Sequence, residues 1–288
     1  MTRKIKILII FLFLLGGWGL WQEPDQIQAK SAKNIYRELG QNLCERKSSF
    51  QVETNYNSTA RFIVKAINGR STSKYYKVFF LAGKYYDQED DFEDGDYAWG
   101  NVSDVYCYYG SGALHFDAQY LESRKKGKKV TKLVKKQAEK IQASCQTNYQ
   151  RIWQTYCYIA KTVKYDHRKN PYYSAWGGLV KGKTVCNGYA LICYRLLNQM
   201  GIPCRFVTGK IKDGKKWYLH AWNIVEIDGK WYNLDSCQDD WGKKPYTDYF
   251  LKTDKYFSKD HKRDSFYRTK SFKKKYPMSK KNYKAEEN

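Results

Sequence analysis

The spacing of hydrophobic positions in the first part of the chain predicts a mixture of helix and strand. Residues 32–43 carry apolar side chains three and four positions apart, the pattern of a helix with one buried face. Three segments rich in β-branched and aromatic residues follow at 50–53, 60–67 and 75–81, and we expect each of them to be a strand. Residues 30–124 are therefore expected to form an α/β extension ahead of the rest of the fold.

The middle of the chain has the apolar periodicity of helices. Residues 130–165 predict two of them, and the basic, glycine-containing segment 125–129 before them is expected to be an exposed connector. A third helix is predicted to begin at Cys186 and to end at Gly201, with Pro203 just beyond it.

A β-hairpin is predicted over residues 216–234. Its turn is Asp228-Gly229, a dipeptide that strongly favours a two-residue connection between antiparallel strands. The register that follows puts His220 and Asp235 on one face as diagonal neighbours, roughly 7–8 Å apart at the backbone. An imidazole and a carboxylate can close that gap to a hydrogen bond.

A cysteine stands in the first turn of the third predicted helix. The backbone N–H groups of a first turn have no partner inside the helix, and together with the helix dipole they favour an anion, here the thiolate of Cys186. Cys193, two turns further along the same face, is expected to be an ordinary buried thiol. A helix-start cysteine with His220 and Asp235 provides the three groups that thiol catalysis needs: a nucleophile, a base and an acid that orients the base.

The sequence around these three residues resembles the transglutaminase-like superfamily of papain-fold thiol enzymes, in particular its exported bacterial members. The similarity is strongest over residues 155–251. It is carried by four segments: Gly182-Lys-Thr-Val-Cys186-Asn-Gly-Tyr-Ala, Gly201-Ile-Pro-Cys-Arg-Phe-Val-Thr-Gly209, His220-Ala-Trp-Asn and Gly229-Lys-Trp-Tyr-Asn-Leu-Asp235.

The resemblance implies an α+β, papain-like core in which the helix bearing the cysteine packs on an antiparallel sheet bearing the histidine and the aspartate. It assigns the nucleophile to Cys186, the base to His220 and the orienting acid to Asp235. The Cys186 backbone N–H is the first candidate for an oxyanion donor, and the Trp176 indole is a second. A packed core aromatic is the alternative interpretation of Trp176.

The activity implied is the cleavage or transfer of peptide or amide acyl groups through a thioester, as in a cysteine peptidase, amidase or acyltransferase. We favour hydrolysis over amine transfer, because the calcium-regulated cross-linking relatives are larger multidomain chains. No cofactor or metal is expected, since Cys186 and Cys193 are seven residues apart on one helix and fit a tetrahedral centre poorly. Cys237 is a second thiol that could exchange disulfides with Cys186. The alternative function is a non-catalytic binding or scaffold module at an anionic cell surface.

Composition narrows the class of protein and of partner. Hydrophobic residues make up 42% of the 288 positions, which excludes a disordered chain, and a mean hydropathy of −0.78 excludes a polytopic membrane protein. The formal net charge is +23, with cations concentrated at 124–136 and in a basic tail at 273–288 that we expect to be frayed. Such charge favours solubility by itself. No nucleic-acid-binding signature is present, so we expect an anionic wall polymer or membrane surface beside the peptide or protein substrate, and the oligomeric state stays open.

The N-terminal segment 1–29 has the pattern of an export signal or an uncleaved membrane anchor. Arg3, Lys4 and Lys6 precede a short apolar run at 7–15. The protein is therefore expected outside the cytoplasm, either secreted or anchored to the membrane, with its catalytic domain at 125–272.

Overall fold

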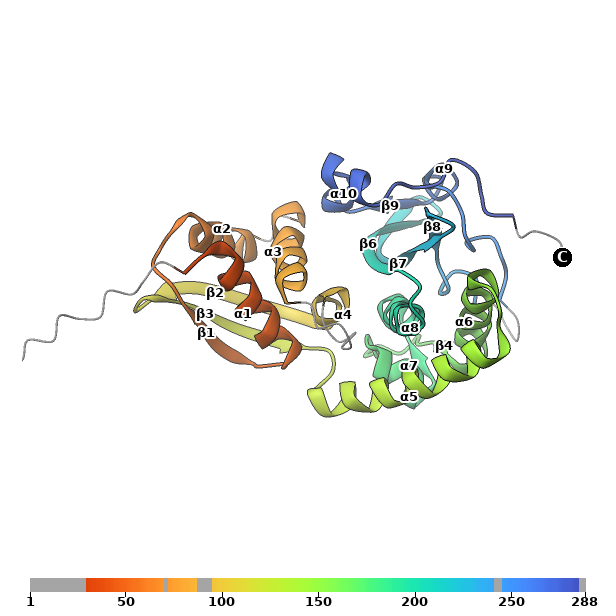
Figure 1. The fold of residues 1–288 in the computed structure, drawn as a ribbon, viewed down its shortest axis with the longest axis horizontal. Helices are drawn as coiled ribbons and strands as arrows, with labels where there is room; N and C mark the ends of the chain where they lie inside the picture. The colour runs from red at the N-terminus through yellow and green to blue at the C-terminus, as the bar shows by residue number, and fades with distance from the viewer. Residues whose placement is uncertain (1–29, 70–71, 87–94, 241–244, 285–288) are drawn as a thin grey trace, which may run out of the picture.

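Two antiparallel sheets, each covered by helices, organise the molecule (Figure 1). The structure is a computed structural model that describes residues 30–69, 72–86, 95–240 and 245–284. The signal or anchor predicted for residues 1–29 lies outside these residues. Within the described ranges, no helix has the length and apolar character that a bilayer crossing requires.

The chain forms its elements in two runs. The first is α1 (Ala32–Cys44), β1 (Ser49–Glu53), α2 (Ser58–Asn68), α3 (Thr72–Tyr85), α4 (Gly95–Gly100), β2 (Val102–Gly110) and β3 (Ala113–Tyr120). The second is α5 (Arg124–Ser144), α6 (Asn148–Thr162), β4 (Lys164–Tyr165), α7 (Ala175–Lys181), β5 (Lys183–Thr184), α8 (Cys186–Gln199), β6 (Cys204–Asp213), β7 (Lys216–Ile227), β8 (Lys230–Leu234), α9 (Asp254–Phe257), β9 (His261–Arg263), a 3₁₀ turn η1 (Ser265–Arg268) and α10 (Lys270–Lys275).

The N-terminal extension contains more helix than the sequence pattern suggested. Its sheet has the order β1-β3-β2, and the prediction of a strand at 50–53 is confirmed. The strands predicted at 60–67 and 75–81 are wrong, because these residues belong to α2 and α3. In α2 the buried side chains recur at helical spacing, and the Asn57 side chain caps the helix by accepting from the Ala60 N–H. Spacing and capping outweigh the β-branched composition of the segment.

The C-terminal sheet has the order β8-β7-β6-β9 and carries the predicted hairpin. Ile227 pairs with Lys230, which confirms the expected register. Asp228 and Gly229 both have positive φ, at 53° and 71°, as a two-residue turn matching the twist of the strands requires. Side chains along β7 point alternately to the two faces of the sheet. Val225 belongs to the core around α8, and Trp222 belongs to a second core with α9, η1 and α10.

Helix α8 lies between this sheet and the helices α5, α6 and α7 (Figure 1). Its side chains from Gly188 to Leu197 are all buried, and the Asn223 side chain of β7 donates a hydrogen bond to the Ala190 carbonyl at 3.0 Å. At the start of α8, Gly188 allows Thr184 and Ser174 to lie close to the helix. A Cβ at that position would stand 2.1 Å from Thr184 Oγ1 and 2.7 Å from the Ser174 carbonyl oxygen. The α+β core, with the cysteine-bearing helix packed on an antiparallel sheet, is confirmed.

The connector predicted at 125–129 is wrong, because these residues form the first turns of α5. Ser123 begins the helix by accepting from the Lys126 N–H, and Gly127 and Val130 are buried against the core. The lysines between them point outward. Composition suggested a loop here, but the buried positions continue the helical period of the segment behind it.

The C-terminal segment also differs from the expected frayed tail as far as residue 284. Phe272 and Tyr276 are buried in the core against β6–β8, and the Arg205 guanidinium donates to the Tyr276 hydroxyl at 2.6 Å. The Ser279 N–H then donates to the Trp231 carbonyl. Aromatic side chains spaced among the lysines pack into the core and fix the backbone that carries these lysines.

Candidate active site

Cys186 occupies the first position of α8, where backbone N–H groups are free to meet an anion. The preceding residue, Val185, has an extended backbone and supplies no side-chain cap to the helix. Its own N–H donates to the Tyr172 carbonyl at 3.0 Å, which fixes the chain as it enters the helix. The start of α8 is therefore held in place while its first N–H group stays available to a developing oxyanion.

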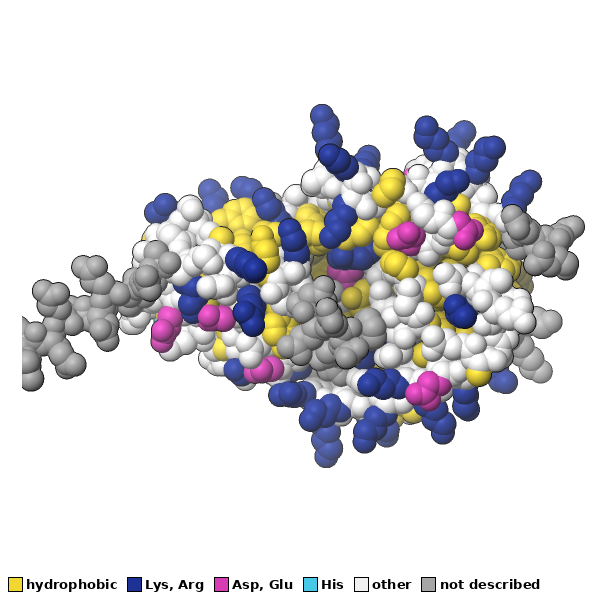
Figure 2. Space-filling view, in the orientation of Figure 1, with side chains coloured by type: hydrophobic (Ala, Val, Ile, Leu, Met, Phe, Trp, Pro, Cys, Tyr) yellow, Lys and Arg dark blue, Asp and Glu magenta, His cyan; other side chains and the backbone are white. Residues whose placement is uncertain are grey.

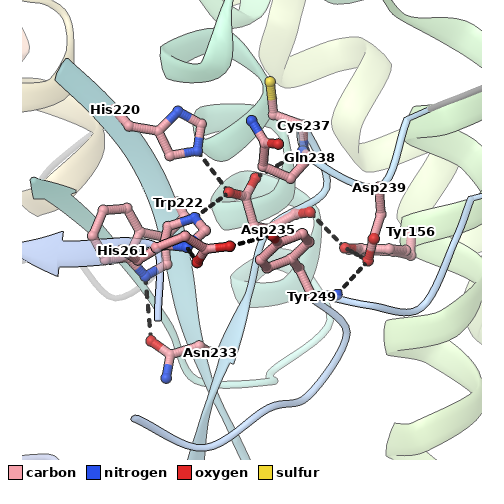
Figure 3. A network of polar contacts seen from close by, with 11 residues as sticks. Tyr156, His220, Trp222, Asn233, Asp235, Cys237, Gln238, Asp239, Tyr249 and His261 are labelled. Carbon is pink, nitrogen blue, oxygen red and sulfur yellow. Dashed lines mark hydrogen bonds and ion pairs between the residues drawn. The ribbon is translucent and has the colours of Figure 1, made fainter. Parts of the chain in front are cut away.

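His220 and Asp235 meet across the end of the β7–β8 hairpin (Figure 3). His220 Nε2 donates to Asp235 Oδ2 at 2.6 Å, and both side chains are buried. The other ring nitrogen, Nδ1, is not engaged with Asp235, and Cys186 lies close enough to raise the pKa of His220. The structure therefore brings together the three residues that the sequence singled out. Their roles as nucleophile, base and orienting acid stay predictions.

The Asp235 carboxylate has a complete set of hydrogen-bond donors. Oδ1 accepts from the N–H groups of Cys237 at 3.0 Å and Gln238 at 3.2 Å. Oδ2 accepts from His220 and, at 3.1 Å, from Nε2 of a second histidine, His261 (Figure 3). Burial acts to raise the pKa of Asp235, but its bonds and charge interactions with the two histidines outweigh burial and hold that pKa well below its usual range.

The same interactions determine the charge of His220. Burial opposes a charged imidazole, whereas the Asp235 carboxylate and then Cys186 favour it. The balance raises the pKa of His220 to about 10. An imidazolium in contact with both groups can keep a thiolate paired and can release its proton to a leaving group.

His261 is a residue that the sequence analysis missed. It stands in the three-residue strand β9, at the edge of the sheet beside β6. Its Nδ1 contacts Asp260 Oδ1 at 2.6 Å, and its ring centroid lies 5.5 Å from that of His220. A strand this short has no periodic pattern, so only the neighbouring Asp260 hinted that the histidine had a polar partner.

A polar network behind Asp235 fixes its backbone. The Tyr156 hydroxyl of α6 lies 2.6 Å from the Asp235 carbonyl oxygen and 2.7 Å from Asp239 Oδ2. Asp235 N–H donates to the Tyr249 carbonyl at 3.2 Å, and Tyr249 N–H donates to Asp239 at 2.9 Å. Burial raises the pKa of Asp239 to about 6. The loop after β8 is thereby joined to α6, which makes the position of the carboxylate rigid.

Residues 135–236 match the family model described as the transglutaminase-like superfamily, and Cys186, His220 and Asp235 all lie inside the match. This segment belongs to the transglutaminase-like superfamily. Two solved structures are similar at 17% identity and a TM-score of 0.34: a candidate cysteine protease from Cytophaga hutchinsonii and a protein named as a TGase. Each match covers 47% of this chain and, respectively, 62% and 44% of the other, less than two thirds of either. No curated protein is significantly similar in sequence.

Trp176 is placed in the transglutaminase-like core as a packed aromatic on α7. Its ring makes an edge contact with Tyr172 and lies under the ammonium groups of Lys126 and Lys181, at 4.3 and 5.4 Å from the ring centroid. Its backbone N–H donates to the buried Glu122 carboxylate at 3.2 Å. None of these partners belongs to the cysteine site, so the contacts favour the packing interpretation, and the indole role stays a prediction.

The other two cysteines of interest differ in their surroundings. Cys193 is buried in the transglutaminase-like core, as expected. Cys237 is half-buried and carries a free thiol, and burial, followed by the nearby charges of Asp235 and Cys186, raises its pKa well above the usual value. A thiol held in the neutral form is a poor nucleophile. Cys237 is therefore no rival to Cys186 for attack on a substrate.

The site also contains a group that could hold a metal ion. One ligand atom from each of His220, Asp235 and His261 lies within 4.8 Å of the others. These three residues are already joined by hydrogen bonds, because Asp235 Oδ2 accepts from both imidazoles. The acceptor Asp235 Oδ2 is thus already occupied by two hydrogen bonds.

The raised pKa of His220 predicts how stability depends on pH. An imidazole in the unfolded chain has a pKa of about 6.5, so the charged His220 stabilises the fold fully below that pH and loses this contribution as pH rises toward 10. The depressed pKa of Asp235 has the opposite sense, because its contribution is complete above about pH 4 and is lost as pH falls. The pair therefore contributes most between about pH 4 and 6.5.

Urea unfolding of the wild type and of His220→Gln across pH 5–10 measures this contribution. We expect the free energy of unfolding of the wild type to fall more steeply above about pH 6.5 than that of His220→Gln. His115→Gln is the matched control, since His115 lies in β3 and contacts the Gly110 carbonyl. Parallel curves for the wild type and His220→Gln would show that His220 is not held as an imidazolium.

Proposed function

We propose that this protein is a thiol enzyme that cleaves peptide or amide bonds, with Cys186 as nucleophile, His220 as acid and base, and Asp235 as the orienting group. One observation carries the proposal. A buried His220–Asp235 pair, hydrogen-bonded at 2.6 Å, lies beside a cysteine at the uncapped start of a helix. A structural histidine needs neither a buried carboxylate on a ring nitrogen nor a cysteine at a helix start beside it.

The geometry supports acyl transfer in two steps. In the first, Cys186 Sγ attacks the carbonyl carbon, the Cys186 N–H stabilises the oxyanion, and His220 gives its proton to the amine as the C–N bond breaks. In the second, water attacks the thioester while His220 takes up its proton, and breakage of the C–S bond restores the thiolate–imidazolium pair. Asp235 stays ionised throughout and holds the imidazole in its tautomer.

We infer that the acyl group passes to water, and that a primary amine is the competing acceptor. Attack on the thioester uses the same three residues whether the acceptor is water or an amine. Which acceptor reacts therefore depends on its access to the thioester. Cys186 is half-buried, Tyr165 lies near it, and Tyr173 and Tyr189 lie near Tyr165. Tyr165 and Tyr173 are exposed aromatics at 43% and 47%, which suits contact with a peptide chain lying over the site.

The acyl-enzyme tests this proposal. p-Nitrophenyl acetate is a simple acyl donor, and intact-mass spectrometry should detect an acetyl group on the wild-type chain, mapped to Cys186. Cys186→Ala should form no such species, and Asp235→Asn should lower the acylation rate by about 10⁴-fold by favouring the wrong imidazole tautomer. Cys193→Ala is the matched control for removal of a thiol. Acetylation that persists in Cys186→Ala would overturn the assignment of the nucleophile.

We further propose that the enzyme acts outside the cytoplasm, at an anionic membrane surface. Helix α5 carries nine cations and one acid, Glu139. Its buried face is apolar, so the cations gather on the solvent side, and Figure 2 shows Lys and Arg side chains projecting along the edge of the molecule where α5 lies. Eight of the nine are exposed: Arg124, Lys125, Lys128, Lys129, Lys132, Lys135, Lys136 and Lys140. Each cation near an anionic lipid surface contributes about 1 kcal/mol of attraction.

Co-sedimentation of the full chain with phosphatidylserine-containing vesicles tests the α5 surface. We expect a variant in which Lys128, Lys132, Lys135 and Lys136 become Gln to bind more weakly than the wild type, with the difference vanishing at high salt. The control carries the same change at four exposed lysines elsewhere: Lys33, Lys65, Lys230 and Lys255. Equal loss in both variants would mean that net charge, and not α5, attracts the membrane.

A further inference from the structure

We propose that His261 is a positioning residue that locks the Asp235 carboxylate in the orientation His220 requires, so that the site is a four-residue arrangement. The inference rests on the proposed function, because it assigns His261 a part in the same site. His261 comes from β9, a different element from those that carry the other three residues. It reaches Asp235 from the side of the sheet edge.

The first support is the way His261 completes the carboxylate. A carboxylate oxygen has two lone pairs, so Asp235 has four acceptor positions. Two backbone N–H groups fill those on Oδ1, His220 fills one on Oδ2, and His261 Nε2 fills the last at 3.1 Å. With donors on both oxygens, the carboxylate cannot rotate without breaking bonds in a buried site, and removal of His261 leaves one acceptor empty.

The second support is that His261 is itself held rigidly. Its Nδ1 lies 2.6 Å from Asp260 Oδ1, and the other Asp260 oxygen accepts from the Tyr249 hydroxyl. The ring centroid is 4.5 Å from that of Phe257 and 5.1 Å from that of Trp222. The side chain is 1% exposed. Packed aromatic rings and a polar partner restrict the imidazole, which is what a residue that positions another group needs.

The third support is that His261 has a polar partner at each ring nitrogen. Both nitrogens of His261 face carboxylate oxygens, and an ionised carboxylate only accepts hydrogen bonds. The imidazole therefore bridges Asp235 and Asp260 through its two ring nitrogens. A structural residue on a sheet edge could fill this space with an apolar side chain. The buried Asp235 carboxylate makes a donor necessary at the Nε2 end, and the partly exposed Asp260 carboxylate gives Nδ1 a polar partner.

Two amide substitutions separate positioning from packing. Gln at 261 can place its N–H₂ near the position of Nε2 and keep the bond to Asp235, whereas Asn reaches only as far as Nδ1 and loses it. Both lose the aromatic ring, so both should destabilise the fold to a similar degree. We expect His261→Asn to lower kcat for p-nitrophenyl acetate by up to about 100-fold with KM little changed, as a misplaced catalytic group does. His261→Gln should retain kcat within a few-fold, and His115→Gln should be unchanged.

A measurement without turnover accompanies the kinetics. The short His220–Asp235 hydrogen bond should give a far-downfield proton signal in the NMR spectrum of the wild type, identified by its absence in His220→Gln. The signal should persist in His261→Gln and be lost in His261→Asn. Equal kcat and equal signals in the Gln and Asn variants would reduce His261 to a packing residue and overturn the inference. If the signals follow the expected order but no variant, nor the wild type, forms an acyl-enzyme, the positioning role stands and the proposed function fails.

Discussion

The buried carboxylate of Asp235 is the constraint on which the site depends. A carboxylate removed from water costs several kcal/mol unless donors replace the lost hydration. Here two imidazoles and two backbone N–H groups replace it. Because the donors come from β7, β9 and the loop after β8, the three segments must be in register before the carboxylate is satisfied. The site is thus a consequence of the same pairing that builds the sheet.

The surrounding elements serve to keep that pairing fixed. The Asp228-Gly229 turn sets the register of β7 and β8, and the Tyr156 hydroxyl of α6 holds the backbone at Asp235. On the other side of β7, α8 is tied to the strand by the Asn223 side chain, which donates to the Ala190 carbonyl, and Gly188 lets the start of α8 lie close to Thr184 and Ser174. The nucleophile and its base therefore belong to two rigid elements. Precise placement of this kind is what allows a thiol in a helix start to act on a bound carbonyl.

The sequence was informative where a pattern is local and periodic. The α8 helix, its cysteine, and the hairpin that aligns His220 with Asp235 follow from spacing and from one turn dipeptide. The two segments at 60–67 and 75–81 were misjudged because their β-branched and aromatic composition competed with helical spacing, and burial in the N-terminal core decided in favour of the helix. His261 could not be predicted, because its partner is 26 residues away in the chain and its strand has only three residues. The ordered C-terminal segment likewise depends on long-range contacts of Phe272 and Tyr276.

Site-resolved alkylation of the native chain tests the central claim most directly. The chain has eight cysteines, and limiting iodoacetamide followed by peptide mass spectrometry reports the order in which they react. The account predicts that Cys186 is labelled first, ahead of Cys237 and Cys193, and that His220→Ala removes this advantage by removing the imidazolium that stabilises the thiolate. Labelling of Cys186 no faster than Cys237 in the wild type, or unchanged by His220→Ala, would contradict the account.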